Sequence, residues 1–317
     1  ISAAIGYLAP ARVRPNLDIL ADTLVRRLLF KQSRCTGVEV EDEAGSVRSI
    51  TARLVVVCAG ALLTPSLLLR SGIGPKAMLE KLSVPCVADR PGVGQNLCDH
   101  PALGVLCDVQ APAVVDFDQP IIQTILRYTA NQSDKRNDLQ IEQISFAGRP
   151  GGPAQFLLAP VLEYQYGRGE LTLQSADPYA APVVSNRFCE DDRDARRLAE
   201  CMLDTLAFTR TGALAEMITG VRFPDLSRGQ SLPEIEALCR RFAGSGYHPC
   251  GTAKMGREED PMAVVDPRGR CFDVEQLVVA DASIMPSVPR ANTNLTCLMI
   301  GEHIGEWLRT EPHEYGL

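Results

Sequence analysis

Several residue types that mark particular protein classes are scarce in this sequence. Only 5% of its 317 residues are aromatic, with a single Trp, and only four are His. Lys and Arg form no dense stripe and the formal net charge is -7, so binding to nucleic acid or to anionic membranes is disfavoured. The longest apolar run, residues 54–69, is interrupted at Thr64 and Pro65. It is shorter than the ~20 residues that span a bilayer, so we expect no transmembrane helix.

Paired cysteine motifs are also missing. The eleven cysteines occur singly, with no C-x-x-C pair and no Cys/His cluster at zinc spacing, so we predict no metal site. Their number is odd, and Cys58 and Cys297 lie in apolar runs. This usage favours buried free thiols in a reducing compartment. With no visible signal peptide, we expect a cytoplasmic protein.

The patterns that are present predict an α/β (α+β) protein. A chain of this length suggests about two domains of ~150 residues each. Short apolar or alternating segments predict strands at 16–20, 28–30, 36–41, 47–52 and 54–58. The last of these is fully apolar and β-branched, which is typical of a strand covered on both faces. Thr64 and Pro65 then predict the start of a helix, and Gly72 its end.

From about residue 98 the sequence changes character, because prolines and polar segments interrupt it. Strands are predicted at 154–162, 169–175 and 276–280, and helices at 191–209, from Ser231 onward and at 295–308. The last helix is apolar nearly all round, so we expect it to be buried. We interpret residues 1–97 and 246–317 as parts of one α/β domain. Residues 98–245 form a second domain inserted into it and built on an antiparallel sheet, with a ligand pocket expected between the two.

The segment Gly246–Gly256 carries the strongest chemical signal. It places His248 between Tyr247 and a proline, ahead of a turn of small residues. A histidine near a glycine-rich turn is most often structural, but its unperturbed pKa of roughly 6.5 also suits proton transfer. Downstream, Asn292-Thr293-Asn294 opens the final apolar helix. An imidazole and a carboxamide are groups that could take the proton and hold the oxygen of an alcohol.

Three stretches of the sequence match one known family in order and in spacing. They are Gly60–Gly74, Gly92–His100 and a C-terminal set made of Tyr247–Gly256, Val279–Ser283 and Asn292–Asn294. Together they resemble the glucose–methanol–choline (GMC) family of flavin oxidoreductases, and its choline dehydrogenase-like and choline oxidase-like members in particular. The resemblance covers essentially the whole chain.

The resemblance implies FAD as cofactor, held by a Rossmann-like domain, and oxidation of an alcohol to an aldehyde or ketone by hydride transfer to flavin N5. His248 matches the family's active-site base. Asn294 is matched to the position where the family carries His or Asn to bind the substrate oxygen. The other positions matched to flavin contacts are Val25, Tyr247, Asp281, Ala282, Asn292 and Thr293. For His100 we favour a structural role over chemistry.

One feature of that family is absent. No G-x-G-x-x-G turn follows a strand, so the turn that holds the FAD pyrophosphate is missing and the FAD-binding domain is predicted to be incomplete. An N-terminal segment of the same enzyme is therefore an expected partner, beside a small alcohol and O2 or another electron acceptor. Two alternatives stay open, a flavin-dependent lyase of the same family and a non-catalytic fragment. No residue decides between an oxidase and a dehydrogenase.

The middle segment is expected to line the substrate pocket. The aromatic residues that could do so are Phe146, Phe156, Tyr164 and Tyr166. A cationic alcohol would need an aromatic cage or a carboxylate, for which Glu163 is a candidate by residue type alone. The identity of the alcohol therefore stays open at this stage.

Overall fold

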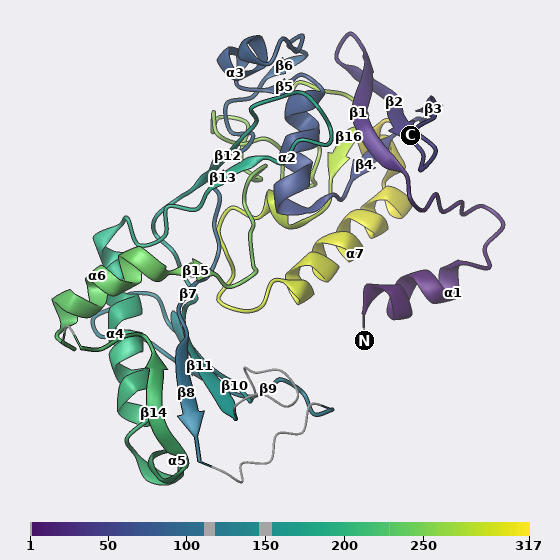
Figure 1. The fold of residues 1–317 in the computed structure, drawn as a ribbon. Coiled ribbons are helices and arrows are strands. Elements are labelled where there is room, and N and C mark those ends of the chain that lie inside the picture. The colour runs from purple at the N-terminus through teal and green to yellow at the C-terminus, as the bar shows by residue number, and fades with distance from the viewer. Residues whose placement is uncertain (1, 111–117, 146–153, 228) are drawn as a thin grey trace.

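The computed structural model describes residues 2–110, 118–145, 154–227 and 229–317 (Figure 1). The chain folds around two hydrophobic cores, one built mainly by the two ends of the sequence and the other by its middle. In Figure 1 the first part lies above the second, and the short strands β7 (Pro101–Ala102) and β15 (Gly244–Ser245) lie between them. The predicted α/β class and the antiparallel sheet are confirmed. No helix within the described ranges combines the length and the apolar character needed to cross a membrane.

The first core is covered by two small sheets. The strands β1 (Leu24–Lys31), β2 (Arg34–Glu41) and β3 (Val47–Thr51) form an antiparallel sheet, and β4 (Val55–Val57) pairs in parallel with β16 (Leu277–Val279). These strands were predicted from their patterns. The strand predicted at 16–20 was wrong. That segment is exposed and pairs with no strand of the described chain, so its backbone forms no ladder of inter-strand hydrogen bonds.

The helix α2 (Gly60–Arg70) begins four residues before the start predicted at Thr64. Pro65 therefore lies inside the helix, where it cannot donate to the carbonyl of Ala61. The hydroxyl of Thr252 donates to that carbonyl instead, at 2.5 Å. This side chain replaces the missing helical hydrogen bond and ties α2 to the loop that follows His248.

The second core lies under a seven-stranded antiparallel sheet whose main order is β14-β8-β11-β10-β9. Its strands are β7 (Pro101–Ala102), β8 (Val105–Val109), β9 (Ile122–Tyr128), β10 (Leu139–Ile144), β11 (Gln155–Leu162), β14 (Ile218–Phe223) and β15 (Gly244–Ser245). Helix α4 (Asp192–Phe208) packs on β10 and β11, and α6 (Leu232–Phe242) packs on α4. Both helices were predicted, including the capping box at Ser231.

Shorter elements complete the fold. They are α1 (Ala9–Ala11), β5 (Ile73–Gly74), α3 (Lys76–Lys81), β6 (Ala88–Asp89), β12 (Glu170–Thr172), β13 (Val183–Ser185) and α5 (Gly212–Met217), with helical turns at Ala4–Leu8, Ala282–Ile284 and Pro312–Tyr315. Strand β12 is shorter than the predicted 169–175. Leu171 of β12 and the nearby Leu173 pack in the first core, so this part of the middle segment returns to the first half of the molecule.

Helix α7 (Asn294–Thr310) was expected to be buried all round, and this was wrong. Only Ile300 and Ile304 are buried, whereas Leu295 is 76% exposed. One face of the helix packs on the first core. In Figure 1 the N-terminal helical turns lie beside another part of it. Leu295 and Met299 of α7 are exposed in the described chain.

Candidate active site

His248 lies in the loop between β15 and the first core, and a buried carboxylate holds its backbone. Oδ1 of Asp99 accepts hydrogen bonds from the backbone N–H of His248 at 2.9 Å and of His100 at 2.7 Å. Oδ2 accepts from the hydroxyl of Ser245 at 2.5 Å. Asp99 is only 1% exposed. One side chain therefore fixes two histidines that are 148 residues apart in the sequence.

The loop needs a glycine at position 246 because the chain passes close to His100 there. A Cβ on Gly246 would lie 2.7 Å from the carbonyl oxygen of His100, closer than real Cβ atoms approach. Tyr247 then takes a left-handed backbone with φ of 65° and is 89% exposed. These two residues turn the chain so that the imidazole of His248 faces inward.

The two imidazoles meet edge to face, with Nδ1 of His100 and Nδ1 of His248 3.0 Å apart. Burial, followed by the charge of His248, lowers the pKa of His100 to about 4, so this ring is neutral. Its Nε2 lies 2.9 Å from the carbonyl oxygen of Pro289, which can only accept, so Nε2 carries the proton. Nδ1 of His100 is then bare and accepts a hydrogen bond from Nδ1–H of His248.

This pairing leaves Nε2 of His248 as the bare nitrogen. Burial lowers the pKa of His248, with Asp99 opposing the shift, which favours the neutral ring. The amide Nδ2 of Asn292 lies 3.2 Å from that Nε2 and donates to it. The arrangement exposes a basic nitrogen and a carboxamide donor side by side.

His248 and Asn292 both line a pocket of about 480 Å³ that lies mainly against the seven-stranded sheet. Its walls are mainly apolar and include Leu103, Gly104, Ile122, Ile144, Leu157, Ala159, Val161, Phe223 and Phe242. Its remaining polar side chains are Gln140, Glu142, Glu163, Ser245 and Tyr247. Among the residues proposed from sequence to line it, Glu163 does so, whereas Phe156, Tyr164 and Tyr166 are not part of its lining and Phe146 lies outside the described residues.

Glu163 is a buried carboxyl group behind the histidine pair. It is 1% exposed, with its Oε2 3.8 Å from Nε2 of His100 and 3.3 Å from Nη2 of Arg127. Burial raises the pKa of Glu163 to about 7, against the lowering effect of Arg127. When ionised, the carboxylate is compensated by Arg127.

The structure separates the remaining residues that were matched to the site. Asn294 lines a neighbouring hollow of about 490 Å³ together with Asn292, Arg127 and Leu295, and is not part of the lining of the pocket at His248. Thr293 occupies the N-cap position of α7 without a side-chain capping hydrogen bond, and Val25 lines a third hollow of about 420 Å³ beside β4. Tyr247, His248 and Asn292 are therefore the predicted residues that meet at one pocket. His100 is a member of this group that the sequence reasoning had left as structural.

Asp281 and Ala282 connect β16 to the loop after His248. Oδ2 of Asp281 accepts from the backbone N–H of Gly60 at 2.9 Å and from the hydroxyl of Thr64 at 2.5 Å. The carbonyl of Ala282 accepts from the N–H of Gly251. Asp281 thus connects the N-terminal turn of α2 to the end of β16 by hydrogen bonds.

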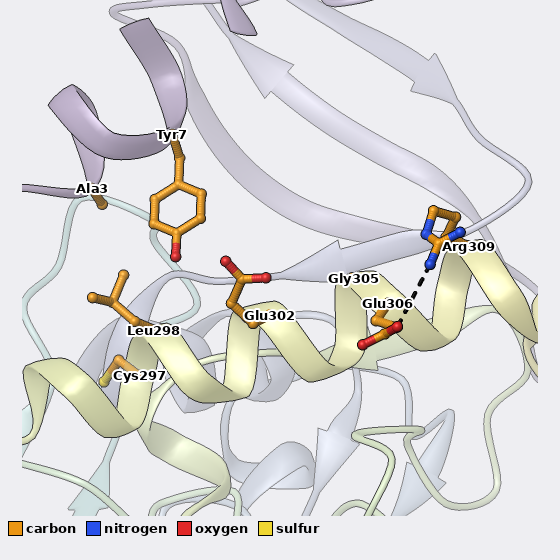
Figure 2. A pocket seen from close by; sticks show the side chains of 9 residues that line it. Ala3, Tyr7, Cys297, Leu298, Glu302, Gly305, Glu306 and Arg309 are labelled. Carbon is orange, nitrogen blue, oxygen red and sulfur yellow. Dashed lines mark ion pairs between the residues drawn. The ribbon is translucent and has the colours of Figure 1, made fainter. Parts of the chain in front are cut away.

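A further groove of about 650 Å³ lies between the N-terminal helical turn and α7, away from the histidines (Figure 2). Figure 2 shows the ring of Tyr7 directed at Glu302 of α7, and a hydrogen bond to that carboxylate raises the pKa of Tyr7. Gly301 and Gly305 leave this side of α7 without side chains. The groove marks the open face of α7 rather than a reaction centre.

The fold is that of a known class of α/β oxidoreductases. Pyridoxine 4-oxidase from Mesorbium loti superposes with a TM-score of 0.87 at 26% identity, covering 98% of this chain and 62% of that one. Formate oxidase from Aspergillus oryzae superposes with a TM-score of 0.86 over 96% of this chain and 63% of that one, at 20% identity, which shows the fold alone.

The chain belongs to the GMC oxidoreductase family, whose sequence profiles match residues 1–102 and 165–301. It is 36% identical to 5-(hydroxymethyl)furfural oxidase of Methylovorus sp. over 98% of this chain and 61% of that protein. It is 34% identical to human mitochondrial choline dehydrogenase over 98% of this chain and 57% of that protein. The chain therefore spans about three fifths of the length of these relatives.

FAD is the cofactor of this family, and two observations fit a flavin ring beside His248. Tyr247 presents an open aromatic face next to the imidazole. The hydroxyl of Ser283, beside the corner at Asp281 and Ala282, is buried without a hydrogen-bond partner in the described chain. These two features fit a flavin ring, whereas the sequence offers no glycine-rich turn for the pyrophosphate.

Proposed function

We propose that this protein oxidises a small alcohol to an aldehyde or ketone, with His248 as general base and Asn292 as the group that binds the substrate oxygen. The observation that carries the proposal is the contact between Nε2 of His248 and the amide of Asn292 at the wall of the pocket. FAD supplies the hydride acceptor when it is bound.

The hydrogen-bond pattern assigns each nitrogen a task. The alcohol donates its O–H to Nε2 of His248, and the amide N–H of Asn292 turns to the alcohol oxygen, where negative charge develops. As His248 gains the proton, its Nδ1–H keeps donating to His100, which holds the ring in place. His100 acts through His248 and is a positioning residue.

Asn292 takes the role that the sequence comparison had given to Asn294. Both amides lie at the start of α7, two residues apart, and spacing alone does not distinguish them. Asn292 contacts the base at 3.2 Å and lines its pocket, whereas Asn294 lines the neighbouring hollow. The start of α7 also carries a partial positive charge, which favours negative charge on a group bound there.

An N-terminal nucleotide-binding segment completes the FAD site in this proposal. The β4–β16 pair has only two strands in the described chain, so β4 offers a free edge. Val56 of β4 is 39% exposed, Leu63 of α2 55% and Leu295 of α7 76%. Large apolar surface of this kind is typical of a face that another segment covers.

The pocket favours an alcohol with an apolar body. Its walls are mostly aliphatic, and Phe223 and Phe242 pack edge to face with ring centroids 5.7 Å apart. The charge of Glu163 is met by Arg127, so this carboxylate offers little to a cationic substrate. Glu142 is the other carboxyl group in the lining, and its own hydrogen bond comes from Gln140 at 2.7 Å.

The test is anaerobic mixing of the flavin-loaded protein with a panel of small alcohols. Bleaching of the flavin absorbance is expected, and His248→Gln should slow it by roughly 10²–10⁴-fold without changing the flavin content. His313→Gln, which alters an exposed histidine on the C-terminal turn, is the matched control. A yellow protein that stays oxidised with every alcohol would favour the lyase, and a colourless preparation the non-catalytic fragment.

A further inference from the structure

Cys98 and Cys250 are direct partners across two antiparallel segments. The N–H of Cys98 donates to the carbonyl of Cys250 at 2.9 Å, and the N–H of Cys250 donates to the carbonyl of Cys98 at 2.8 Å. Residues that exchange both hydrogen bonds have Cα atoms about 5.5 Å apart. This lies within the roughly 4.4–6.8 Å that disulfides span.

The two thiols also touch. Their side chains hydrogen-bond to each other, and Sγ of Cys98 lies 3.2 Å from the carbonyl oxygen of Asn96. Both residues are fully buried. The hydrogen bond from Cys250, helped by Arg168, lowers the pKa of Cys98, while the same contact raises that of Cys250. The interaction therefore favours the thiolate on Cys98 over the thiolate on Cys250.

The position of the pair gives it a structural effect. Cys98 lies two residues before His100, and Cys250 two residues after His248, so the thiol pair is the neighbour of the imidazole pair along the same two segments. The chain between the two cysteines contains the whole second core. A disulfide here would join the two ends of the segment that contains the second core.

We propose that Cys98 and Cys250 form a reversible intrachain disulfide when the protein meets a hydroperoxide. With hydrogen peroxide, the thiolate of Cys98 attacks one peroxide oxygen and the O–O bond breaks. Hydroxide leaves and takes up the proton that Cys98 released, so that a sulfenic acid and one water result. The thiol of Cys250 then attacks the sulfenic sulfur, the S–S bond forms, the S–O bond breaks, and the oxygen leaves as a second water. The two thiols lose two electrons, which reduce one peroxide. Because both thiols are buried, a small oxidant such as hydrogen peroxide is required.

This inference does not depend on the proposed alcohol oxidation, and its test needs no turnover. The reduced protein is treated with hydrogen peroxide, alkylated, digested without reduction and mapped by mass spectrometry. The expected product is one linked pair of peptides that joins Cys98 to Cys250 and disappears with dithiothreitol. The midpoint of thermal unfolding should rise in the oxidised protein, because the closed loop restricts the unfolded chain.

Two serine variants separate the pair from other thiols. Cys98→Ser should abolish the linked peptides and the rise in the unfolding midpoint. Cys107→Ser should keep both, since Cys107 is another buried thiol that contacts the carbonyl two residues before it, with no cysteine opposite. In wild-type protein, the exposed Cys58 and Cys86 show when the peroxide has reacted. If these two are oxidised while Cys98 and Cys250 are still alkylated separately, the proposal is overturned. This readout does not depend on the folding of the variants.

Discussion

His100 and His248 form one hydrogen-bonded unit in which the fully buried ring sets the proton position of the pocket-facing ring. The 3.0 Å contact between their Nδ1 atoms and the 2.9 Å contact of His100 Nε2 with the carbonyl of Pro289 leave a single consistent arrangement of protons. In that arrangement the free lone pair of His248 points at Asn292. The contact with His100 thereby fixes which nitrogen of His248 can accept a proton and where its lone pair points.

Replacing His100 by Phe should lower the rate of substrate oxidation by roughly 10²-fold, because the ring of His248 loses the acceptor that orients it. KM should change much less, since His100 is buried and does not line the pocket. The measurement is the rate of flavin reduction and KM for the same alcohol. His100→Asn keeps a polar partner and is expected to lose less. A KM effect without a rate effect would make His100 a residue of the pocket wall rather than a positioning residue.

The two amides at the start of α7 give a matched comparison. Asn292→Asp should reduce the rate by roughly 10²–10³-fold, because it removes a donor and places an anion where the alkoxide charge develops. Asn294→Asp carries the same change two residues away and should have only a small effect, since Asn294 lines the other hollow. Flavin reduction kinetics of both variants decide the matter. The reverse ranking would restore the role first given to Asn294.

Local patterns were sufficient for much of the fold. The alternating strands β2 and β3, the amphipathic α4 and the capping box at Ser231 each carry their signal within a few residues, so they could be predicted. The His248 loop was also recognisable, because its residue order is unusual.

Local patterns were insufficient where a distant residue decides the outcome. Thr64-Pro65 has the local form of a helix start, but the hydroxyl of Thr252 lets the helix begin earlier. The role of His100 depends on a contact with His248 across 148 positions. Asn292 lines both hollows and contacts His248, whereas Asn294 lines only the neighbouring hollow. Sequence spacing contains none of this information.

The buried carboxyl of Glu163 should make stability depend on pH. Its pKa is about 7 in the folded protein against 4.5 for a glutamate exposed to water, so between these values the folded state holds a proton that the unfolded state has released. The contribution of Glu163 to wild-type stability, relative to Glu163→Gln, should therefore be fully present below pH 4.5 and be lost as the pH rises to about 7. The loss is on the order of 3 kcal/mol. This loss is measured by urea unfolding of both proteins at about pH 5 and about pH 8, two values that enclose most of the pH range in which it occurs. An unchanged difference between them would show that the folded carboxyl is already ionised at the lower pH.

The bond from Thr252 to Ala61 can be tested by a double-mutant cycle. Thr252→Val removes the hydroxyl in a fully buried position and leaves the Ala61 carbonyl without its donor, so unfolding free energy should fall by about 1–3 kcal/mol. In a Pro65→Ala background the backbone N–H at position 65 can donate to that carbonyl, so the same change should cost clearly less. Urea unfolding of the four proteins gives the coupling energy. Equal costs in both backgrounds would mean that the hydroxyl does not compensate for Pro65, and that α2 accommodates this proline by bending.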